Sequence, residues 1–259
     1  ARQRGRAVGH KTRRVSPRFD ECEITHIART PIDVNTAHAQ HRAYVNTLKE
    51  LGCKVIELPA EPDLPDSVFI EDTAFILPEV AVITRPGADS RKPETESIIQ
   101  TLSPYTDLIH VCAPATVDGG DVLVLGKNIY IGLSTRSNQE AIDQLNELLC
   151  GYEYIVAGVK IHDCLHLKTA VTRLDEKTLL INRNWVDTAH FKNFDLIEVD
   201  PSEPFAANCL PIGEVILFPA AFPKTCARLE ERGYKVVTVD ISELAKAEGA
   251  VTCCSLILW

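Results

Sequence analysis

The chain has 259 residues, of which 45% are hydrophobic and 24% charged, with a net charge of -9; this is the composition of an ordinary globular protein with a sizeable core. It contains no run of eighteen apolar residues and no leader-like apolar segment after its basic start, so we expect no membrane span, and the nine irregularly spaced cysteines fit reduced thiols in a cytoplasmic protein. Residues 1–18 hold seven Lys or Arg and no acid, leaving 20 basic against 36 acidic residues in the remainder, an acidic body that argues against nucleic acid and for a small cationic partner.

Strands and helices are predicted to alternate from the start of the chain. Arg6 to Val15 indicates a strand, and Asn35 to Leu51 has apolar residues at helical spacing that stop at Gly52. The elements expected next are strands at Lys54 to Leu58, Val68 to Leu77 and Ala81 to Thr84, a helix at Asp89 to Leu102, and a strand at Leu108 to Cys112.

The same order then recurs three times. The second unit is predicted as strands Asp121 to Leu125 and Asn128 to Gly132, helix Asn138 to Leu149 and strand Tyr154 to Val159. The third is predicted as strands Leu167 to Leu174 and Thr178 to Asn182, a weak helix or loop near Val186 to Phe194, and strand Asp195 to Asp200. The fourth is predicted as strands Ala207 to Pro211 and Glu214 to Pro219, helix Pro223 to Gly233 and strand Tyr234 to Asp240, before a short helix Ser242 to Ala247 and a last strand Thr252 to Leu258.

Each unit therefore reads strand, turn, strand, helix, strand. The last strand stands alone, without the rest of a unit. The N-terminal part of the chain has a strand, a helix and a second strand but lacks the first strand of a unit. Joining the two ends therefore completes a fifth unit and closes a ring. The predicted fold is an α/β propeller of five blades. An open sheet in two α/β domains would show parallel order throughout and does not explain a hairpin in every unit.

Polar residues stand at one shared phase of this repeat, the start of each first strand. Asp66 to Asp72, Asp118 to Asp121, His166, Asn208 and Cys253 occupy it, and in a ring such positions face one centre. Burying many ionisable groups costs several kcal/mol each unless they are paired or serve a ligand. Taken singly, Asp118-Gly-Gly-Asp121 is equally a plain turn, His166 a core histidine and Asn208 a backbone brace.

A cysteine, a histidine and an acid are the parts of nucleophilic catalysis. Several carboxylates beside a thiolate would repel anions and attract a flat cation such as guanidinium, which they bind in bidentate fashion. Arg85 and Arg136, at one phase of neighbouring units, either hold a substrate carboxylate or form surface ion pairs.

Seven motifs closely resemble the dimethylarginine dimethylaminohydrolase family of the guanidine-modifying (pentein) superfamily. They are Pro65-Asp-Ser-Val-Phe-Ile-Glu-Asp72, Ile83-Thr-Arg-Pro-Gly-Ala-Asp-Ser-Arg91, Asp118-Gly-Gly-Asp-Val122, Tyr130-Ile-Gly-Leu-Ser-Thr-Arg-Ser-Asn138, Leu165-His-Leu-Lys168, Ala206-Ala-Asn-Cys209 and Val251-Thr-Cys-Cys-Ser255. The resemblance runs from about His41 to the C-terminus and implies one pentein-type catalytic domain over residues 1–259, with no cofactor.

The resemblance also implies roles for single residues. Cys253 would be the nucleophile that attacks the guanidinium carbon, His166 the acid and then the base, and Asp118 the group that orients His166. The expected substrate contacts are Glu71 and Asp72 on the guanidinium, Asp66 on the α-amino group, and Arg85 and Arg136 on the α-carboxylate. Cys254 would pack on the other face of the strand.

Some alternatives stay open at this point. Residues 16–33, where the family has a mobile lid, do not align with its known forms, so an arginine deiminase-like hydrolase of unmethylated arginine remains the alternative, and a noncatalytic binding module of the same fold is the third reading. The chain is expected to be a monomer or homodimer. There is no C-x-x-C motif for a dedicated zinc site, although a thiolate beside a histidine, here Cys253 and His166, can trap inhibitory zinc.

Overall fold

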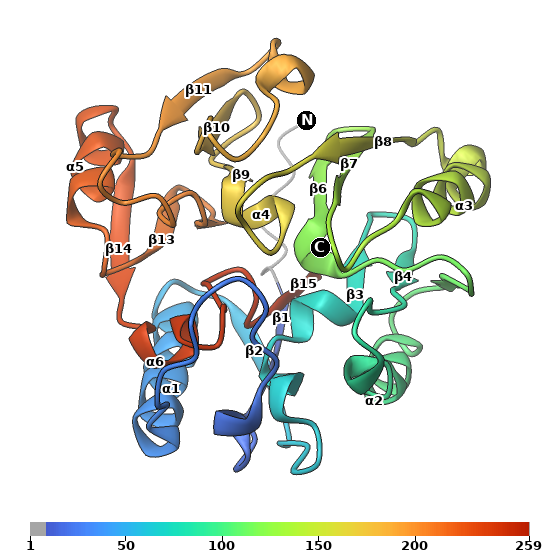
Figure 1. Ribbon diagram of the computed structural model, residues 1–259, viewed down its shortest axis with the longest axis horizontal. Helices are drawn as coiled ribbons and strands as arrows, with labels where there is room; N and C mark the ends of the chain where they lie inside the picture. The colour runs from blue at the N-terminus through green and yellow to red at the C-terminus, as the bar shows by residue number, and fades with distance from the viewer. Residues whose placement is uncertain (1–8, 259) are drawn as a thin grey trace.

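The repeated units fold into separate three-stranded sheets within residues 9–258, the part of the chain that the computed structural model describes. In each of the five sheets found there, two strands pair antiparallel and the third runs parallel to the middle one. Figure 1 shows the sheets arranged around one centre, with the longer helices on the outside. The predicted five-bladed α/β propeller is confirmed.

The bounds of the blades follow the predicted order closely. The first two complete blades comprise β3 (Ala74–Ile76), β4 (Ala81–Ile83), α2 (Glu94–Leu102) and β5 (Leu108–His110), then β6 (Val122–Leu125), β7 (Asn128–Leu133), α3 (Gln139–Leu149) and β8 (Ile155–Lys160). The next two comprise α4 (Leu167–Ala170), β9 (Val171–Arg173), β10 (Thr178–Ile181) and β11 (Asp195–Glu198), then β12 (Leu210–Ile212), β13 (Val215–Pro219), α5 (Pro223–Glu231) and β14 (Lys235–Val239). The uncertain segment between β10 and β11 forms a 3₁₀ helix at Thr188–Phe191.

The fifth blade joins the two ends of the chain, as predicted. Strand β15 (Leu256–Leu258) pairs antiparallel with β1 (Gly9–Arg13), and β1 pairs in parallel with β2 (Lys54–Leu58) after the crossover helix α1 (Val34–Glu50). Residues 6–8 of the predicted first strand lie outside the described part. The short helix α6 (Ser242–Ala245) leads the chain back toward this blade.

Local sequence explains where the longest helix, α1, begins and ends. The Asp33 carboxylate accepts hydrogen bonds from the backbone N–H groups of Asn35 and Thr36, which caps the N-terminus. Ala37, Tyr44 and Leu48 lie buried on one face of α1. The helix ends before Gly52, whose φ of 86° is accessible to glycine at little cost.

The hydrophobic core lies between neighbouring blades. Val82 and Phe75 of one blade pack in one cluster with Ile129 and Leu145 of the next, and Leu123 of that blade packs with residues of the third. Burying one such large apolar side chain contributes about 1.5–3 kcal/mol. A blade therefore gains much of its stability from its neighbours, as expected of a repeat that cannot bury its own apolar face.

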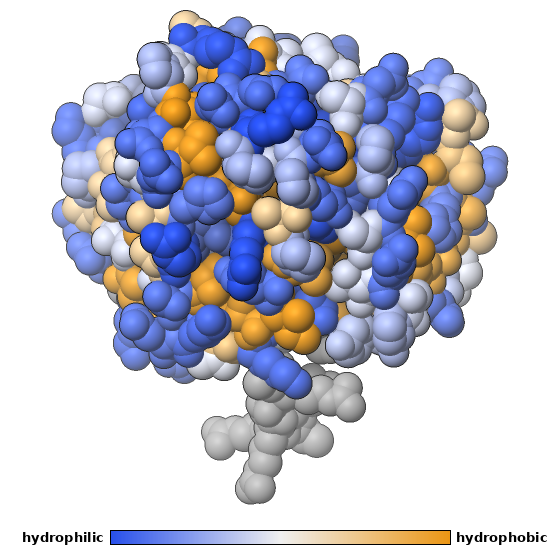
Figure 2. Space-filling view, turned by 90° about the horizontal axis from the view of Figure 1, so that it is seen from below, coloured by the Kyte–Doolittle hydropathy of each residue, from blue (hydrophilic) through white to orange (hydrophobic). Residues whose placement is uncertain are grey.

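On the side seen in Figure 2, the surface is mainly hydrophilic, and hydrophobic residues form patches that hydrophilic residues interrupt. None of the helices in the described region combines the length and hydrophobicity that crossing a membrane requires.

Four predicted strands begin later than expected, and this shapes the centre of the ring. Instead of starting at Val68, Leu167, Ala207 and Thr252, the strands start at Ala74, Val171, Leu210 and Leu256. Two 3₁₀ helices, Pro65–Val68 and Ile70–Thr73, precede β3, α4 precedes β9, and a turn precedes β15. An apolar run alone does not distinguish a buried strand from a buried tight turn. The hydrophobic pattern therefore placed the starts of these strands too early.

Candidate active site

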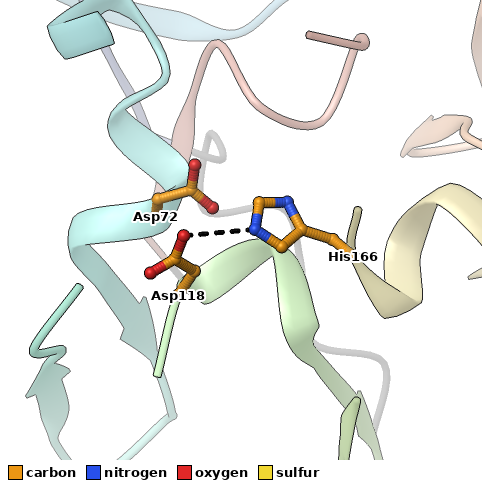
Figure 3. Close-up of side chains that lie close together, drawn as sticks. All are labelled: Asp72, Asp118 and His166. Atoms are coloured by element: carbon orange, nitrogen blue, oxygen red, sulfur yellow. Dashed lines mark hydrogen bonds and ion pairs between the residues drawn. The ribbon is translucent and has the colours of Figure 1, made fainter. Parts of the chain in front are cut away.

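The turns that enter the blades bring a histidine and two carboxylates together at the centre. His166 stands just before α4, Asp118 just before the 3₁₀ turn that starts β6, and Asp72 in the turn before β3. Figure 3 shows the Asp72 and Asp118 carboxylates on the same side of the imidazole. His166 Nε2 lies 3.2 Å from Asp118 Oδ2, and all three residues are buried. The repeat therefore brings together residues that lie about 48 positions apart in sequence.

Glycine at position 120 makes this close approach possible. A Cβ atom there would lie 2.5 Å from His166 Nδ1 and 2.9 Å from Asp72 Oδ1. The Gly120 N–H also donates to Asp72 Oδ1 at 2.8 Å. A side chain would displace the imidazole, so Asp118-Gly-Gly-Asp121 is more than a plain turn: it is the surface against which His166 packs.

The charge state of His166 follows from these neighbours. Burial disfavours the imidazolium, but the negative charges of Asp72 and Asp121 and the hydrogen bond that the ring donates to Asp118 outweigh burial and raise the pKa of His166 to about 9. Asp121 itself is buried, which raises its pKa to about 6 against the opposing effects of His166, Ser134 and Ser137. At neutral pH His166 is therefore an imidazolium that can donate a proton.

Asp72 is held by an arginine that the sequence analysis did not assign. Arg91 Nη1 lies 2.6 Å from Asp72 Oδ2, and Arg91 Nη2 lies 2.8 Å from Glu94 Oε2. Although burial opposes ionisation, His166 and Arg91 lower the pKa of Asp72 to about 2. Burial raises the pKa of Glu94 to about 7 despite Arg91. Arg91 stood at the end of one of the seven motifs, but nothing in its spacing showed that it is buried.

The two arginines that were predicted to bind a carboxylate, Arg85 and Arg136, lie in different places. Arg136 is buried, its Nη1 3.6 Å from Asp118 Oδ2 and its Nη2 donating to Thr25 Oγ1 at 3.0 Å. Arg85 is half-buried and its guanidinium donates to the carbonyl of Ala115. The structure thus brings Arg136 to the cluster. The cation that pairs with Asp72 is Arg91, whereas Arg85 lies outside the cluster.

Asp66 lies at the edge of the same cluster. Its Oδ2 accepts the backbone N–H of Glu23 at 3.1 Å, and its carbonyl accepts from Arg91 Nη2. Burial raises the pKa of Asp66, against the opposing charge of Arg91. A buried carboxylate with one backbone donor keeps acceptor capacity for a further cation.

The nucleophile candidate lies in the turn before β15. The Cys253 carbonyl accepts the N–H of Glu71 at 3.1 Å, and its N–H donates to the Ala250 carbonyl. Burial, reinforced by the negative charges of Glu71 and Asp72, raises the pKa of the Cys253 thiol above its usual range. Cys253 is 8% exposed, whereas Cys254 is fully buried in the core. Only Cys253 lines the cavity described below.

Glu71 connects this turn to the rest of the site. Its Oε1 lies 2.5 Å from Lys168 Nζ, and its Oε2 accepts the hydroxyl of Thr252 at 2.7 Å. Asn208 Oδ1 in turn accepts the Thr252 N–H at 3.1 Å. Both Glu71 oxygens are therefore engaged, and Lys168 is a further charged residue that sequence reasoning did not assign. Glu71 and Asp72 both lie in the 3₁₀ turn Ile70–Thr73 rather than in a strand.

A cavity of about 260 Å³ opens over these groups. Cys253, His166 and Glu71 line it together. Much of the remaining wall is apolar and comes from the blades of β9 to β14 and from α6, notably Phe205, Phe222 and Ile241. A cationic centre with an apolar substituent fits a wall of this kind.

The close grouping of Asp72, Asp118 and His166 also invites the question of a metal. Their possible ligand atoms lie within 4.8 Å of one another. However, Asp72 is already paired with Arg91 and His166 is protonated at neutral pH, so the trio is better described as a hydrogen-bonded charge cluster. Inhibitory zinc between Cys253 and His166 remains a prediction.

Comparison with known proteins gives a consistent family. The family model described as N,N dimethylarginine dimethylhydrolase, eukaryotic, matches residues 28–258. The N(G),N(G)-dimethylarginine dimethylaminohydrolase of Pseudomonas aeruginosa is 37% identical over 226 residues, covering 86% of this chain and 89% of that protein. The protein of the same name from Streptomyces coelicolor is 38% identical over 245 residues, covering 94% of each chain.

Solved structures agree in fold. A cysteine-to-serine mutant of the Pseudomonas aeruginosa enzyme, complexed with citrulline, superposes with a TM-score of 0.91 at 33% identity, covering 96% of this chain and 98% of that chain. A dimethylarginine dimethylaminohydrolase adduct with S-methyl-L-thiocitrulline gives a TM-score of 0.92, covering 96% and 99%. The N-terminal domain of ArgZ, an arginine dihydrolase, shares the fold with a TM-score of 0.82 at 19% identity, covering 98% of each chain.

Proposed function

The chain belongs to the dimethylarginine dimethylaminohydrolase family, and from that membership we infer that it hydrolyses the guanidinium C–N bond of Nω-methylated arginine. Dimethylarginine and water give citrulline and dimethylamine. The observation that carries this function is that Cys253 and His166 line one cavity while His166 Nε2 lies 3.2 Å from Asp118 Oδ2. These are the nucleophile, acid and orienting group that the reaction needs.

The first half of the reaction begins at Cys253. Its thiol has a raised pKa in the free protein, and a guanidinium beside it supplies the positive charge that favours the thiolate, whose proton is released to water. We propose that the sulfur bonds to the central guanidinium carbon and that the C–N bond to dimethylamine then breaks. The imidazolium of His166 gives its proton to the departing nitrogen, which leaves as the neutral amine.

The second half releases citrulline. Neutral His166 accepts a proton from a water molecule, whose oxygen attacks the carbon bonded to sulfur. The C–S bond breaks, the remaining hydroxyl proton passes to the departing sulfur and restores the Cys253 thiol, and the former water oxygen becomes the ureido oxygen of citrulline. Asp118 keeps the ring oriented through both transfers, because its carboxylate is fully buried and bonded to the Gly87 N–H on its other oxygen.

The remaining contacts are proposed from charge and from closeness to the His166 cluster, since of the predicted substrate-binding residues only Glu71 lines the cavity. Asp72 keeps the guanidinium cationic, Asp66 takes the α-amino group and Arg136 the α-carboxylate. Glu71 stands on the cavity wall, but with Lys168 and Thr252 on its oxygens its larger part is to hold the nucleophile turn. The role of Arg85 as a carboxylate ligand stays a prediction. Arg91 is connected to the proposed site because it pairs with Asp72.

The apolar wall favours methylated arginine over arginine. Phe205, Phe222 and Ile241 offer a surface that N-methyl groups can cover, and each buried CH₂-sized group contributes roughly 0.8 kcal/mol. An unsubstituted guanidinium would leave hydrogen-bond donors against this surface. The arginine deiminase-like alternative therefore lacks polar partners there.

Substrate comparison tests the proposal. The protein is incubated with dimethylarginine, monomethylarginine, arginine and agmatine, and the urea-type product and released amine are measured. We expect the highest kcat/KM for a methylated arginine and the lowest for agmatine, which lacks the carboxylate that Arg136 binds. Preference for arginine would establish the deiminase alternative, and inertness toward all four would contradict hydrolysis.

The proposed site is assembled from one chain. Cys253, His166, Asp118 and Asp72 come from the turns of different blades of the same ring, so we propose that residues 1–259 act as a single catalytic domain. Monomer or homodimer and a cytoplasmic location stay predictions.

A further inference from the structure

A single carboxylate holds the backbone of the segment that covers one side of the cavity. Glu248 Oε2 accepts the N–H of Thr25 at 2.7 Å, and Glu248 Oε1 accepts the N–H groups of His26 and Ile27 at 2.6 and 3.1 Å. Residues 22–33 form no helix or strand. Glu248 therefore supplies the acceptors that regular backbone pairing would otherwise provide.

The held segment touches both the cavity and the charged cluster. His26 and Ile27 line the cavity together with Cys253. The Thr25 hydroxyl accepts from Arg136, and the N–H of Glu23 donates to Asp66 Oδ2. The position of residues 23–27 thus sets part of the cavity wall and the surroundings of the two groups proposed to bind the amino-acid end of the substrate.

Glu248 occupies a position that its own backbone disfavours. Its φ is 61°, in the left-handed region where glycine is the favoured residue. The turn after α6 fixes it there, since Glu248 N–H bonds to Ala245 and Gly249 N–H bonds to Leu244. A Cβ at Gly249 would lie 2.2 Å from the buried Phe69 ring, so the turn packs directly on that ring and cannot move closer to it. A strained residue with three charge-assisted bonds to a distant segment points to a use beyond folding.

We propose that Glu248 is a positioning residue for substrate binding, which fixes residues 25–27 as one wall of the cavity. This inference rests on the proposed function, because the occupant of the cavity is the substrate. If the segment is held only part of the time, the apparent affinity falls by the fraction of molecules that have the wall in place. Loss of Glu248 is therefore expected to act on KM more than on kcat.

The main test replaces Glu248→Gln and measures amide hydrogen exchange without substrate. The neutral side chain keeps its size but offers one oxygen and no charge, so the amides of Thr25, His26 and Ile27 should exchange about tenfold faster or more. KM for dimethylarginine should rise by about tenfold, with kcat within about threefold of wild type. Unchanged exchange at these three amides would overturn the proposal, as would faster exchange with an unchanged KM.

Glu243→Gln is the matched control. Glu243 lies on the neighbouring helix α6, loses the same charge, and accepts a single backbone N–H, that of Asp33. It should leave exchange at residues 25–27 and KM near wild type. An equal effect from Glu243→Gln would show that net charge rather than the three bonds is responsible.

Glu248→Gly separates positioning from folding. Glycine accepts the left-handed conformation without strain, which offsets part of the stability lost with the three bonds, so the melting temperature should change little, while exchange at residues 25–27 and KM should still rise. A lower melting temperature with the same amide protection would assign Glu248 a purely structural role. If the protein hydrolyses no guanidine and yet these amides exchange faster, the proposed function fails and the contact itself stands.

Discussion

The turn before β6 and the turn before β12 occupy the same place in two blades but differ in content. Asp118 to Asp121 places two buried carboxylates against His166. Ala206 to Cys209 is neutral, and its amide, Asn208, bonds to the Lys168 carbonyl and to both the N–H and the hydroxyl of Thr252. The repeat fixes where a residue lies, and the residue type decides whether the turn carries chemistry or holds its neighbour.

The turn before β15 extends this comparison to two adjacent cysteines. Cys253→Ser should reduce turnover by roughly 10³-fold or more, because the hydroxyl is a far weaker nucleophile than the thiolate. Cys254→Ser should keep most of the activity and lower the melting temperature, since it buries a hydroxyl in the core. Product formation and thermal unfolding measure both, and equal loss of activity from the two would show that the wrong sulfur was assigned.

Replacing the acid Asp118 in the turn before β6 should slow the chemical step. Asp118→Asn removes the charge beside His166 and should lower kcat by roughly 10²–10³-fold with a smaller change in KM. Asn208→Ala, in the neutral turn, should lower kcat by about tenfold or less, through looser placement of Thr252 beside Cys253. Steady-state kinetics decide, and the comparison is broken if Asn208→Ala costs as much as Asp118→Asn.

The same contrast applies to two arginines of one motif. Arg91→Met leaves Asp72 and Glu94 buried without their cation and should lower the free energy of unfolding by about 3 kcal/mol. Arg85→Met removes a half-buried group bonded to one carbonyl and should cost about 1 kcal/mol or less. Urea denaturation of both variants measures the difference, and similar losses would contradict the assignment of Arg91 to the charged cluster.

The pH dependence of stability should distinguish the two turns. The folded pKa of His166 is raised to about 9 from 6.5, so His166 stabilises the fold fully below pH 6.5, and this contribution is lost as pH rises through 9. The difference in unfolding free energy between wild type and His166→Gln should fall by roughly 2–3 kcal/mol from pH 6 to pH 9.5. For Asn208→Ala the difference should not change with pH; a pH-independent His166 difference would mean that the acidic turn does not charge the ring.

Zinc should give the smallest effect. Micromolar zinc is expected to inhibit modestly and reversibly, because a thiolate and an imidazole can share the ion. Inhibition should strengthen as pH rises toward 9, since the imidazole must lose its proton before it binds metal. Titration of the rate with zinc and a chelator tests this, and a rate that zinc leaves unchanged would count against close approach of Cys253 and His166.

Much of this arrangement was accessible from sequence. The hairpin in every unit and the matching phase of Asp118, His166, Asn208 and Cys253 predicted a ring with these residues at its centre, because a repeat places equivalent positions alike. Strand β2 was predicted with its observed bounds. The tight turns before β3 and β9 were not, because an apolar run buried on all sides has the same composition in a strand and in a turn.

The partners of the charged residues were beyond sequence reasoning. Arg91 contacts Asp72, and Lys168 contacts Glu71. These pairs depend on how the side chains pack in the folded ring, and the repeat pattern of a single sequence does not reveal such pairs. Glu248 was overlooked for the same reason, since its partners lie more than 220 positions earlier in the chain. Its left-handed backbone is likewise set by the tertiary turn.

Closure of the ring by β1 and β15 has a consequence for the timing of activity. Cys253 lies three residues before β15, so the sulfur reaches the centre only when β15 pairs with β1, a strand made much earlier in the chain. While the ribosome still encloses residues 253–258, the emerged blades can fold in sequence but lack the proposed nucleophile. The growing polypeptide is therefore expected to gain hydrolytic activity only after β15 has emerged and closed the ring.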